Sequence, residues 1–569
     1  NSSTGVIDLD ASTPGVYAAT YTTPGTTAGG CAGFMSQTIR VESNTTDFTY
    51  GATAFCVNDT NPKATITGVV DGIFSSATGL VIDPITGTIN LSASTPGNYD
   101  VTYTPPYNFN QLGADIDGIA SGDQFGFSVA VNKAGDVLAV GARLDDPNGA
   151  ESGEVTVYKW NGTAWVQYGN AIAGEFADDN FGWDVALNAA GDRLVVGAQV
   201  SDAGGANSGQ VRVYAYDSGV WVQLGADLDG QAADDRFGWS VDMNAKGDRI
   251  VVGAIFNDGN GSNSGQVRIY ELTNGTWVQL GAAIDGEYAD DYFGNSVAIN
   301  DLGDKIVSGA RNNDGFGSNS GHVRVYEYAS STWSQVGADI NGRTANIYFG
   351  WSVDINAAGD KIVASAPYDY GQNGATSVYS FSTGKWRQEG QEIIGEAGSD
   401  RSGQGEGSAV SMNDLGDRIA IGAHLNDGNG SNSGQVRIYG LESNSWNQLG
   451  FDVDGESANN QLGYSVAMNG VGDRIAAGAW NNVGGAANAG HVRVYETPVI
   501  CPLPMAIILQ QDEDPTFSYG SSSYCSVESD PTPVITGTLG GTFTSTSGLV
   551  INSSTGVIDL DASTPGVYA

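Results

Sequence analysis

Carboxylates are the side chains of this sequence that are best suited to bind a metal ion. Ala-Asp-Asp steps place six of them in three equivalent pairs: Asp178 and Asp179, Asp234 and Asp235, and Asp290 and Asp291. Calcium takes about six to eight oxygen ligands, several of them anionic, so these pairs are candidate calcium ligands. The alternative is that they cap turns, because Asp can satisfy the backbone of a turn without a metal.

Groups suited to catalysis are scarce. The chain has 3 histidines, and His322 and His491 take the start of a segment that begins with Gln in other copies of the repeat described below. His424 follows a Gly-Ala step after which the residue type varies, which predicts an exposed face. No nucleophile elbow, metalloprotease helix or phosphate loop is present. Carboxylates that recur in copy after copy do not single out the acid and partner that a glycosidase needs, so we expect no enzymatic activity.

A repeat positions these residues. Variants of FGWSVDMNAKGDRIVVGA, residues 237–254, begin at Phe125, Phe181, Phe237, Phe293, Phe349, Glu406 and Leu462, spaced 56 or 57 residues apart. Each copy reads as an alternating strand, an Asn-x-x-Gly-Asp turn, an apolar strand, a Gly/Asn-rich loop, a third strand and a fourth strand anchored by Trp. Four antiparallel strands per copy make one propeller blade, so the sequence predicts an all-β fold with a seven-bladed β-propeller.

The two ends of the repeat array predict that the ring closes. The seventh copy has no Trp-anchored fourth strand of its own, whereas residues 109–113 (FNQLG) precede the first copy at the spacing of such a strand. We expect this N-terminal strand to complete the last blade and leave no open sheet edge.

The tryptophans could stack on sugars, but their positions favour packing between blades. Six take one position in the repeat and three more take another. The six are Trp165, Trp221, Trp277, Trp333, Trp386 and Trp446, and the three are Trp183, Trp239 and Trp351.

Blade five breaks the symmetry of the repeat. It has a short hairpin after Pro367 and a longer connection after Trp386. We take this region as a candidate ligand or lateral contact, and the alternative is sequence drift in a tolerant loop. The candidate residues are Tyr368, Asp369, Tyr370, Arg387, Glu389, Glu392, Asp400 and Arg401.

Two smaller modules flank the predicted propeller. Both consist of short alternating segments with Gly, Pro, Asn and Ser turns, which predicts immunoglobulin-like or cadherin-like β-sandwiches. Each has two cysteines at nearly equal spacing, so we predict the disulfides Cys31–Cys56 and Cys501–Cys525, with four free thiols as the alternative. Residues 1–18 are identical to residues 552–569, which predicts a window cut from a longer tandem array, with a duplicated terminus in each chain as the alternative. The expected domains are 1–25, the end of a preceding module; 26–106, a sandwich; 107–498, the propeller; and 499–569, a module completed by the next repeat.

The charge of the chain restricts its partners. It has 64 acidic and 23 basic residues among 569, a net charge of −41 at pH 7. This excess argues against nucleic acid and anionic lipid as partners. The most apolar run, residues 498–509, is short and interrupted by proline, so we expect no membrane insertion.

The repeated FG-x-S-V and V-x-G-A segments resemble the FG-GAP repeats of integrin α-subunits and their bacterial relatives. The GLVI-x-x-x-TG-x-I-x-L-x-A-STPG modules resemble those of giant surface adhesins of Bacteroidota that are exported by type IX secretion. Together the resemblances imply an extracellular structural or adhesive repeat at the cell surface or in a secreted filament. Its partners would be neighbouring repeats, other copies laterally, and a surface glycan or protein. The alternative is a dedicated glycan- or protein-binding propeller on a stalk of sandwiches.

Overall fold

The computed structural model describes residues 15–22, 34–41, 47–67, 72–104, 109–405, 408–483, 485–497, 503–510, 517–519, 529–536 and 539–564. The chain divides into two compact units. One contains Asn1–Glu42 and Tyr107–Val499, and the other contains Ser43–Pro106 and Ile500–Ala569. The regular secondary structure of the described residues is almost entirely β-strand, and no helix among them is long and apolar enough to cross a membrane.

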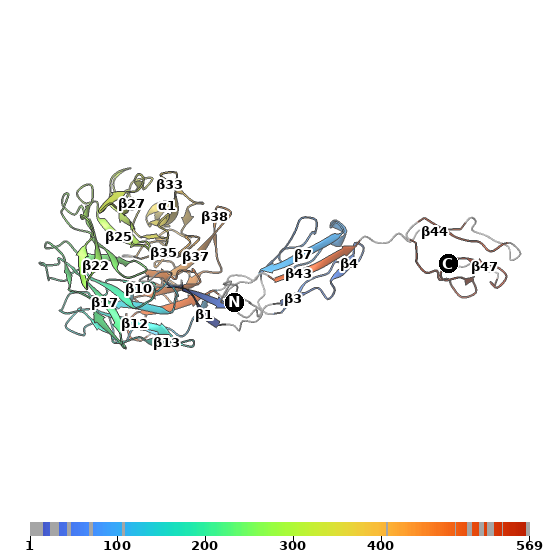
Figure 1. Cartoon of the computed structure of the whole chain (residues 1–569), viewed down its shortest axis with the longest axis horizontal. Coiled ribbons are helices and arrows are strands. Elements are labelled where there is room, and N and C mark those ends of the chain that lie inside the picture. The colour runs from blue at the N-terminus through green and yellow to red at the C-terminus, as the bar shows by residue number, and fades with distance from the viewer. Residues whose placement is uncertain are drawn as a thin grey trace, which may run out of the picture. The chain divides into compact units, whose positions relative to one another are not determined.

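Seven antiparallel sheets of the same design make up most of the first unit within its described residues, beside one two-stranded sheet (Figure 1). The first strands, sheets one to seven, are β10 (Phe125–Val131), β15 (Asp184–Leu187), β20 (Phe237–Met243), β25 (Phe293–Ile299), β30 (Val353–Ile355), β35 (Val410–Met412) and β40 (Ser465–Met468). The second are β11 (Val137–Ala142), β16 (Arg193–Ala198), β21 (Arg249–Ala254), β26 (Lys305–Ala310), β31 (Lys361–Ala366), β36 (Arg418–Gly422) and β41 (Arg474–Ala479). The third are β12 (Glu154–Trp160), β17 (Gln210–Asp217), β22 (Gln266–Thr273), β27 (His322–Ala329), β32 (Ala375–Ser382), β37 (Gln435–Glu442) and β42 (His491–Glu496).

The outer strand of each sheet is split into two short pieces that both pair with the third strand. In sheets one to three these are β13 (Trp165–Gln167) and β14 (Ile172–Ala173), β18 (Val220–Gln223) and β19 (Leu228–Asp229), and β23 (Thr276–Gln279) and β24 (Ile284–Asp285). In sheets four to six they are β28 (Thr332–Gln335) and β29 (Ile340–Asn341), β33 (Lys385–Gln388) and β34 (Ile393–Ile394), and β38 (Ser445–Gln448) and β39 (Val453–Asp454). In sheet seven the two pieces come from residues that precede sheet one in the chain, and they are β8 (Asn110–Gln111) and β9 (Ile116–Asp117).

The first strands contact one another in sequence, and β40 contacts β10, so the sheets form a closed ring. The predicted β-propeller is therefore confirmed. The predicted closure is confirmed as well, because β8 pairs with β42 through Gln111 opposite Tyr495, and β9 pairs with β42 through Asp117 opposite His491. Each sheet provides one innermost strand, so residues at equivalent positions of the repeat surround the ring axis.

Local sequence explains the regularity of the sheets. In the first Asn-x-x-Gly-Asp turn, Asn132 Oδ1 accepts hydrogen bonds from the backbone N–H groups of Asp136 and Val137, both at 2.9 Å. Gly135 in that turn has φ 71°, a conformation that glycine adopts without strain. At the start of β20, a Cβ on Gly238 would lie 2.7 Å from the carbonyl oxygen of Gln210, so a side chain there would clash with backbone.

Apolar side chains between successive sheets form the core of the ring, for example Val251, Ile269 and Phe293. The six tryptophans at the outer-strand position confirm the prediction of packing between blades, because each donates an indole N–H to a backbone carbonyl of the preceding sheet. Trp277 Nε1, for example, donates to Leu224 O at 2.8 Å. The other five bonds are Trp165 to Leu112, Trp221 to Tyr168, Trp333 to Leu280, Trp386 to Val336 and Trp446 to Glu389.

A lysine crosses the end of the ring that carries the Asn-x-x-Gly-Asp turns. Lys133, in the turn of sheet one, lies 2.7 Å from a carboxylate oxygen of Asp301 in sheet four and 2.7 Å from one of Asp414 in sheet six. These side chains are partly exposed, so the pairing in water contributes only modest stability. It nevertheless links turns of three different sheets at this end.

The second unit has a small core of its own. A four-stranded sheet runs β4 (Ala54–Cys56), β43 (Leu503–Gln510), β7 (Gly97–Thr104) and β6 (Ile73–Ser76), beside the pair β3 (Asp47–Thr49) and β5 (Thr65–Thr67). Phe74, Leu91 and Tyr103 pack there with Ile507 and Leu509 of β43. Leu91 begins the 3₁₀ turn η1 (Leu91–Ala93). The remaining pairs are β44 (Phe517–Ser518) with β45 (Val534–Ile535) and β46 (Val550–Ile551) with β47 (Ile558–Asp559).

Three strand pairings cross the domain divisions expected from the sequence. The divisions fall at residues 25 and 499, yet β1 (Gly15–Thr22) pairs with β2 (Phe34–Val41), and β43 pairs with β7 and β4. The alternating apolar pattern of β43 suits a sandwich strand in either module, so the pattern alone could not say which module it completes. Of the predicted disulfide residues, Cys31, Cys501 and Cys525 lie outside the described residues, and both pairings stay predictions.

Candidate functional site

Three of the contact residues predicted in blade five come together around an arginine that the sequence analysis did not single out. Arg343 forms a two-pronged ion pair with the buried Asp369, with nitrogen–oxygen distances of 2.8 and 2.7 Å. Its guanidinium lies 4.1 Å from the ring centroid of Tyr370, whose hydroxyl donates to Glu392 at 2.6 Å. The cluster sits beside the short helix α1 (Asp369–Gln372), in which Tyr370 and Gly371 have positive φ.

A cavity of about 30 Å³ lies next to this cluster and is lined by Arg343, Asp369 and Glu392 together with apolar residues. This volume suits one or two water molecules, whereas small-molecule pockets enclose roughly 300–1,000 Å³. The cluster is therefore a network of satisfied charges at the surface, and it offers no enclosed ligand pocket.

The other predicted residues of blade five lie elsewhere. Arg387 is exposed on β33, and Glu389 forms an ion pair with Lys361 at 3.0 Å. Asp400 is buried and accepts hydrogen bonds from the Ala397 N–H and from Asn426. Tyr368 and Arg401 stack on each other, with the guanidinium carbon 4.7 Å from the ring centroid. The predicted patch is thus divided, and only part of it forms a continuous cluster.

In the candidate calcium pairs, the second Asp of each pair is buried and caps a turn. Asp235 accepts hydrogen bonds from the Ala232 N–H and from Asn257 Nδ2, both at 3.0 Å. Asp179 and Asp291 accept equivalent bonds from the N–H groups of Phe176 and Tyr288. The first members, Asp178, Asp234 and Asp290, are exposed with positive φ. The hydrogen bonds of the buried members match the turn-capping alternative, in which Asp satisfies the backbone of a turn without a metal.

Replacing Asp235 by alanine should lower the free energy of unfolding by about 1–3 kcal/mol, because it leaves the buried Asn257 amide and one backbone N–H without their acceptor. Denaturant unfolding in calcium and in chelator measures the loss, which should be the same in both because the contacts are protein hydrogen bonds. The control is Asp234→Asn at the exposed neighbour, which should stay within about 0.5 kcal/mol of wild type. A loss that appears only in calcium would show that an ion holds this turn.

A cluster of aromatic side chains surrounds the ring axis at the end opposite Lys133. The third residue of each copy of the repeat lies at the start of an innermost strand, and at five of the seven copies it is aromatic. We call these residues the axial aromatic ring: Phe127, Trp183, Trp239, Trp351 and Tyr464. Centroid separations of 4.9–5.0 Å join Tyr464 to Phe127, Phe127 to Trp183, and Trp183 to Trp239. Asn295 of sheet four takes the equivalent position and donates to Trp351 O at 2.6 Å.

Half-buried arginines cover the axial aromatic ring. The guanidinium carbon of Arg143 lies 4.3 Å from the Phe127 centroid, and that of Arg311 lies 4.3 Å from the Trp351 centroid and 5.9 Å from that of Trp239. Such positions are favourable for cation–π attraction. The repeat positions of Trp183, Trp239 and Trp351 predict packing between blades. These side chains do contact neighbouring sheets, but they lie at one end of the ring axis, where a binding partner could reach the propeller.

Several polar groups at this end have no hydrogen-bond partner among the described residues. They include the buried indole N–H groups of Trp183 and Trp239 and the side-chain oxygen of Asn295. Buried polar groups are nearly always paired with protein or water, so these groups are suited to hydrogen bonds with ordered water. His424 lies close by and is buried, with Nδ1 2.8 Å from Gln404 O. The prediction of an exposed face at His424 was wrong, because Tyr464 packs against its ring.

Comparison with known proteins supports the repeat. Residues 116–158, 167–214 and 227–270 match the FG-GAP repeat, so the chain carries FG-GAP repeats within a β-propeller. Among solved structures, a Bacteroides uniformis protein assigned as a 6-phosphogluconolactonase is 12% identical, with a TM-score of 0.45, over 66% of this chain and 98% of its own. A comparison with curated proteins finds no match.

Proposed function

We propose that this chain is a non-enzymatic adhesive module of an extracellular protein, at the cell surface or in a filament. The propeller would bind its partner at the axial aromatic ring. The FG-GAP repeats support a binding or adhesion role, and the resemblance of the flanking modules to those of Bacteroidota surface adhesins supports export by type IX secretion. In this proposal the flanking modules, which resemble immunoglobulin-like sandwiches, act as the stalk.

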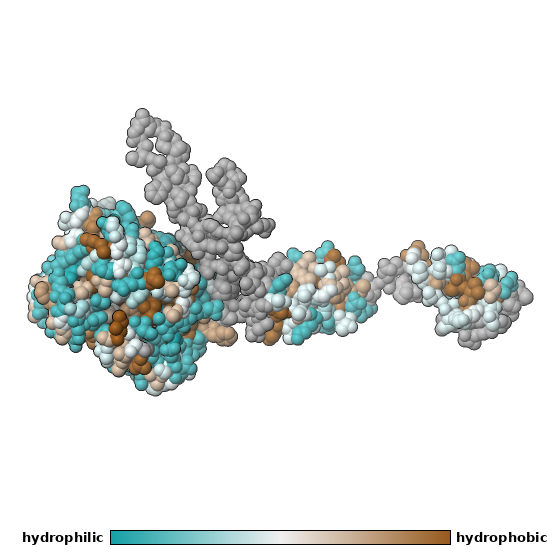
Figure 2. Space-filling model, turned by 90° about the horizontal axis from the view of Figure 1, so that it is seen from below, coloured by the Kyte–Doolittle hydropathy of each residue, from teal (hydrophilic) through white to brown (hydrophobic). Residues whose placement is uncertain are grey.

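The observation that carries the proposal is the combination of half-buried arginines and aromatic rings around the axis. Arg143 and Arg311 provide positive charge at this end of the ring, in a chain whose net charge is −41. Arg143 lies over Phe127 and Trp183, and Arg311 lies over Trp239 and Trp351. Guanidinium groups of this kind suit a carboxylate or other anionic group on a surface glycan or protein. The face of the first unit that Figure 2 shows is mostly hydrophilic, with scattered apolar residues.

The histidines support a non-enzymatic role. All three are buried, and burial lowers the pKa of His322, His424 and His491 to about 4. They are neutral at physiological pH and stay inside the sheets, so none is placed as a surface acid or base. FG-GAP repeats often bind calcium, and in this proposal its ligands are the exposed first members of the Ala-Asp-Asp pairs, Asp178, Asp234 and Asp290, because the buried members already accept protein hydrogen bonds.

Binding of the full chain to cell surfaces and to arrays of acidic glycans tests this proposal. Replacing Arg311 by glutamine should weaken saturable binding by about tenfold or more, because a desolvated charge-assisted contact contributes about 1.5–3 kcal/mol. Arg387→Gln, which removes an exposed arginine on β33 away from the ring, is the matched control and should bind like wild type. Equal binding by the two variants would exclude the axial site, and an absence of saturable binding by the wild-type chain would exclude the adhesive function.

A further inference from the structure

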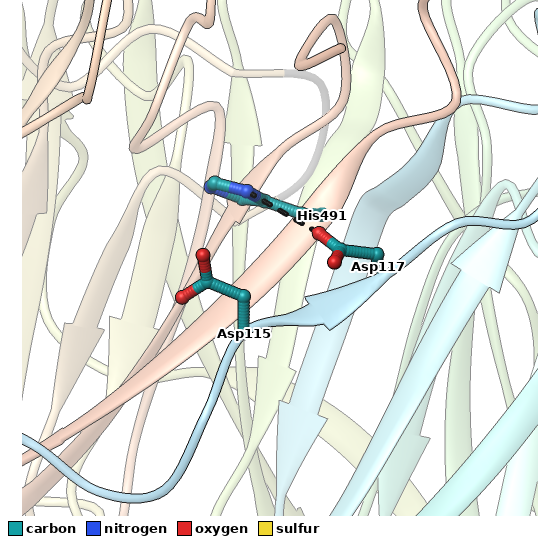
Figure 3. A group of neighbouring side chains, drawn as sticks. All are labelled: Asp115, Asp117 and His491. Carbon is teal, nitrogen blue, oxygen red and sulfur yellow. Dashed lines mark ion pairs between the residues drawn. The ribbon is translucent and has the colours of Figure 1, made fainter. Parts of the chain in front are cut away.

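A histidine and two carboxylates meet on one face of sheet seven (Figure 3). The register of the strands explains the meeting, because Asp117 of β9 lies opposite His491 of β42. Directly opposed residues project their side chains to the same face, and Asp115, two residues before Asp117, shares that face. Candidate ligand atoms of the three residues all lie within 4.8 Å of one another.

The imidazole of His491 has an unused nitrogen pointing into this cluster. The residue is 1% exposed, and its Nδ1 has no hydrogen-bond partner among the described residues. The nearest carboxylate oxygen, on Asp117, is 3.9 Å away, beyond hydrogen-bond distance. An imidazole nitrogen without a hydrogen-bond partner can present its lone pair to a metal ion when the ring proton is on the other nitrogen.

Other sheets have different residues at the position of His491. Where the third strand begins with glutamine, its amide donates to the facing carboxylate, as Gln266 does to Asp285 at 2.6 Å and Gln210 to Asp229 at 2.9 Å. The amide proton there satisfies a carboxylate lone pair. Histidine in place of glutamine brings an imidazole nitrogen to this position, and in the tautomer with the proton on Nε2 the Nδ1 lone pair faces the carboxylates.

The same substitution occurs in sheet four, with the same result. His322 is 1% exposed, its Nδ1 also has no partner in the described chain, and it lies within 4.8 Å of Glu287 and Asp339. Asn341 stands where sheet seven has Asp117, and Glu287 supplies the second carboxylate. These two clusters are the only groups of three such ligand residues in the described part of the chain. They occur in the two sheets that have histidine at this position.

We propose that sheets four and seven each bind a divalent transition-metal ion of the zinc class, through His322 with Glu287 and Asp339, and through His491 with Asp115 and Asp117. One imidazole nitrogen and two carboxylate oxygens suit zinc, whereas calcium takes oxygen ligands. Donor atoms around zinc are about 3.4 Å apart, so closing the observed separations needs only small side-chain rotations. The site differs from the Asp-rich turns considered above for calcium.

Neighbouring charges favour such an ion. Arg493 binds Asp115 at 2.8 and 2.9 Å, and Gln111 Nε2 also donates to Asp115 Oδ1 at 2.6 Å, so the carboxylate is held in place and Oδ2 keeps a second lone pair. Glu456 also pairs with Arg493, so three carboxylates and one guanidinium lie around His491 and negative charge is in excess. A divalent cation would relieve that excess.

Zinc titration of the full chain by calorimetry, in excess calcium to fill oxygen-only sites, tests the proposal. The wild-type chain should bind two zinc ions, His491→Gln and His322→Gln one each, and the double variant none. Glutamine is native at this position in other sheets, so these variants should fold. Cobalt substituted for zinc should give visible absorption that each substitution reduces in step.

The matched control is Asp229→Asn, which alters the equivalent carboxylate in a sheet that has glutamine and should leave two zinc ions bound. Unchanged zinc stoichiometry in the double variant would overturn the assignment of the ligands. A wild-type chain that binds no zinc under these conditions would overturn the proposal altogether. The outcome is independent of the adhesive function, because it needs no partner molecule.

Discussion

Replacing Leu112 by proline is expected to open the propeller ring. The Leu112 N–H donates to Val494 O at 2.7 Å, directly after β8. Proline cannot make this bond and is not tolerated inside a sheet ladder, so the outer strand of sheet seven should detach at a cost of about 3 kcal/mol or more. Trp165 also donates to Leu112 O, so the first sheet loses an anchor at the same time. The unfolding midpoint in denaturant should fall accordingly.

A matched variant separates opening of the ring from ordinary strand damage. Leu224 N–H makes the equivalent bond to Val213 O at 2.7 Å in sheet two, where all strands are continuous in sequence. Leu224→Pro should therefore cause loss of hydrogen-exchange protection mainly in β17 and β18. Leu112→Pro should extend that loss to β42 and β10, on both sides of the seam. If the two variants lost protection over equally local regions, β8 and β9 would not act as the closure of the ring.

The architecture of the ring could be predicted from sequence because each copy of the repeat encodes its own turns and apolar strands. Asn132 and Gly135 show why: a turn that needs one amide cap and one positive φ is specified by residues next to each other in the chain. Closure was predictable for a related reason, because an incomplete last copy and an isolated strand before the first copy match in kind and spacing.

The candidate sites were harder to predict because their partners are distant in sequence. Arg343 meets Asp369 26 residues away, and Lys133 meets Asp301 168 residues away, through packing between sheets that no local pattern records. The histidines His322 and His491 were correctly recognised as variants of a repeated position. Their significance depends on which carboxylates face them, and that required the register of the outer strands.

Carboxylates on the innermost strands, half-buried at Asp242 and Asp354 and buried at Asp184, make the stability of the ring dependent on pH. Asp242 accepts hydrogen bonds from the Met243 N–H at 2.7 Å and from the Ile299 N–H of the next sheet at 2.8 Å. Burial raises its pKa to about 8, and Asp354 and Asp184 contribute further. In the unfolded chain an Asp has a pKa of about 3.9. Between these values the unfolded state gives up a proton that the folded state retains, so the stability contributed by this group falls as pH rises from about 4 to about 8.

Asp242→Ala should remove this penalty. Alanine is native at the same position as Ala130, Ala186 and Ala298, so the strand accepts it. At pH of about 9 the variant should be more stable than wild type by several kcal/mol, because a pKa raised by about 4 units corresponds to about 5 kcal/mol of charge burial, against about 1 kcal/mol for the lost bond to Ile299. Below about pH 3 the gain should vanish, because the wild-type group is then protonated in both states.

Denaturant unfolding of the two chains across this pH range measures the difference, and the exposed Asp217→Ala is the control for removal of a surface charge. The control should shift stability by no more than about 0.5 kcal/mol at any pH. The decisive quantity is the slope: the difference between Asp242→Ala and wild type should grow with pH and level off above about 8. A difference that is constant with pH would mean that Asp242 is charged in the folded ring, and that its two backbone hydrogen bonds and nearby solvent are enough to hold the charge.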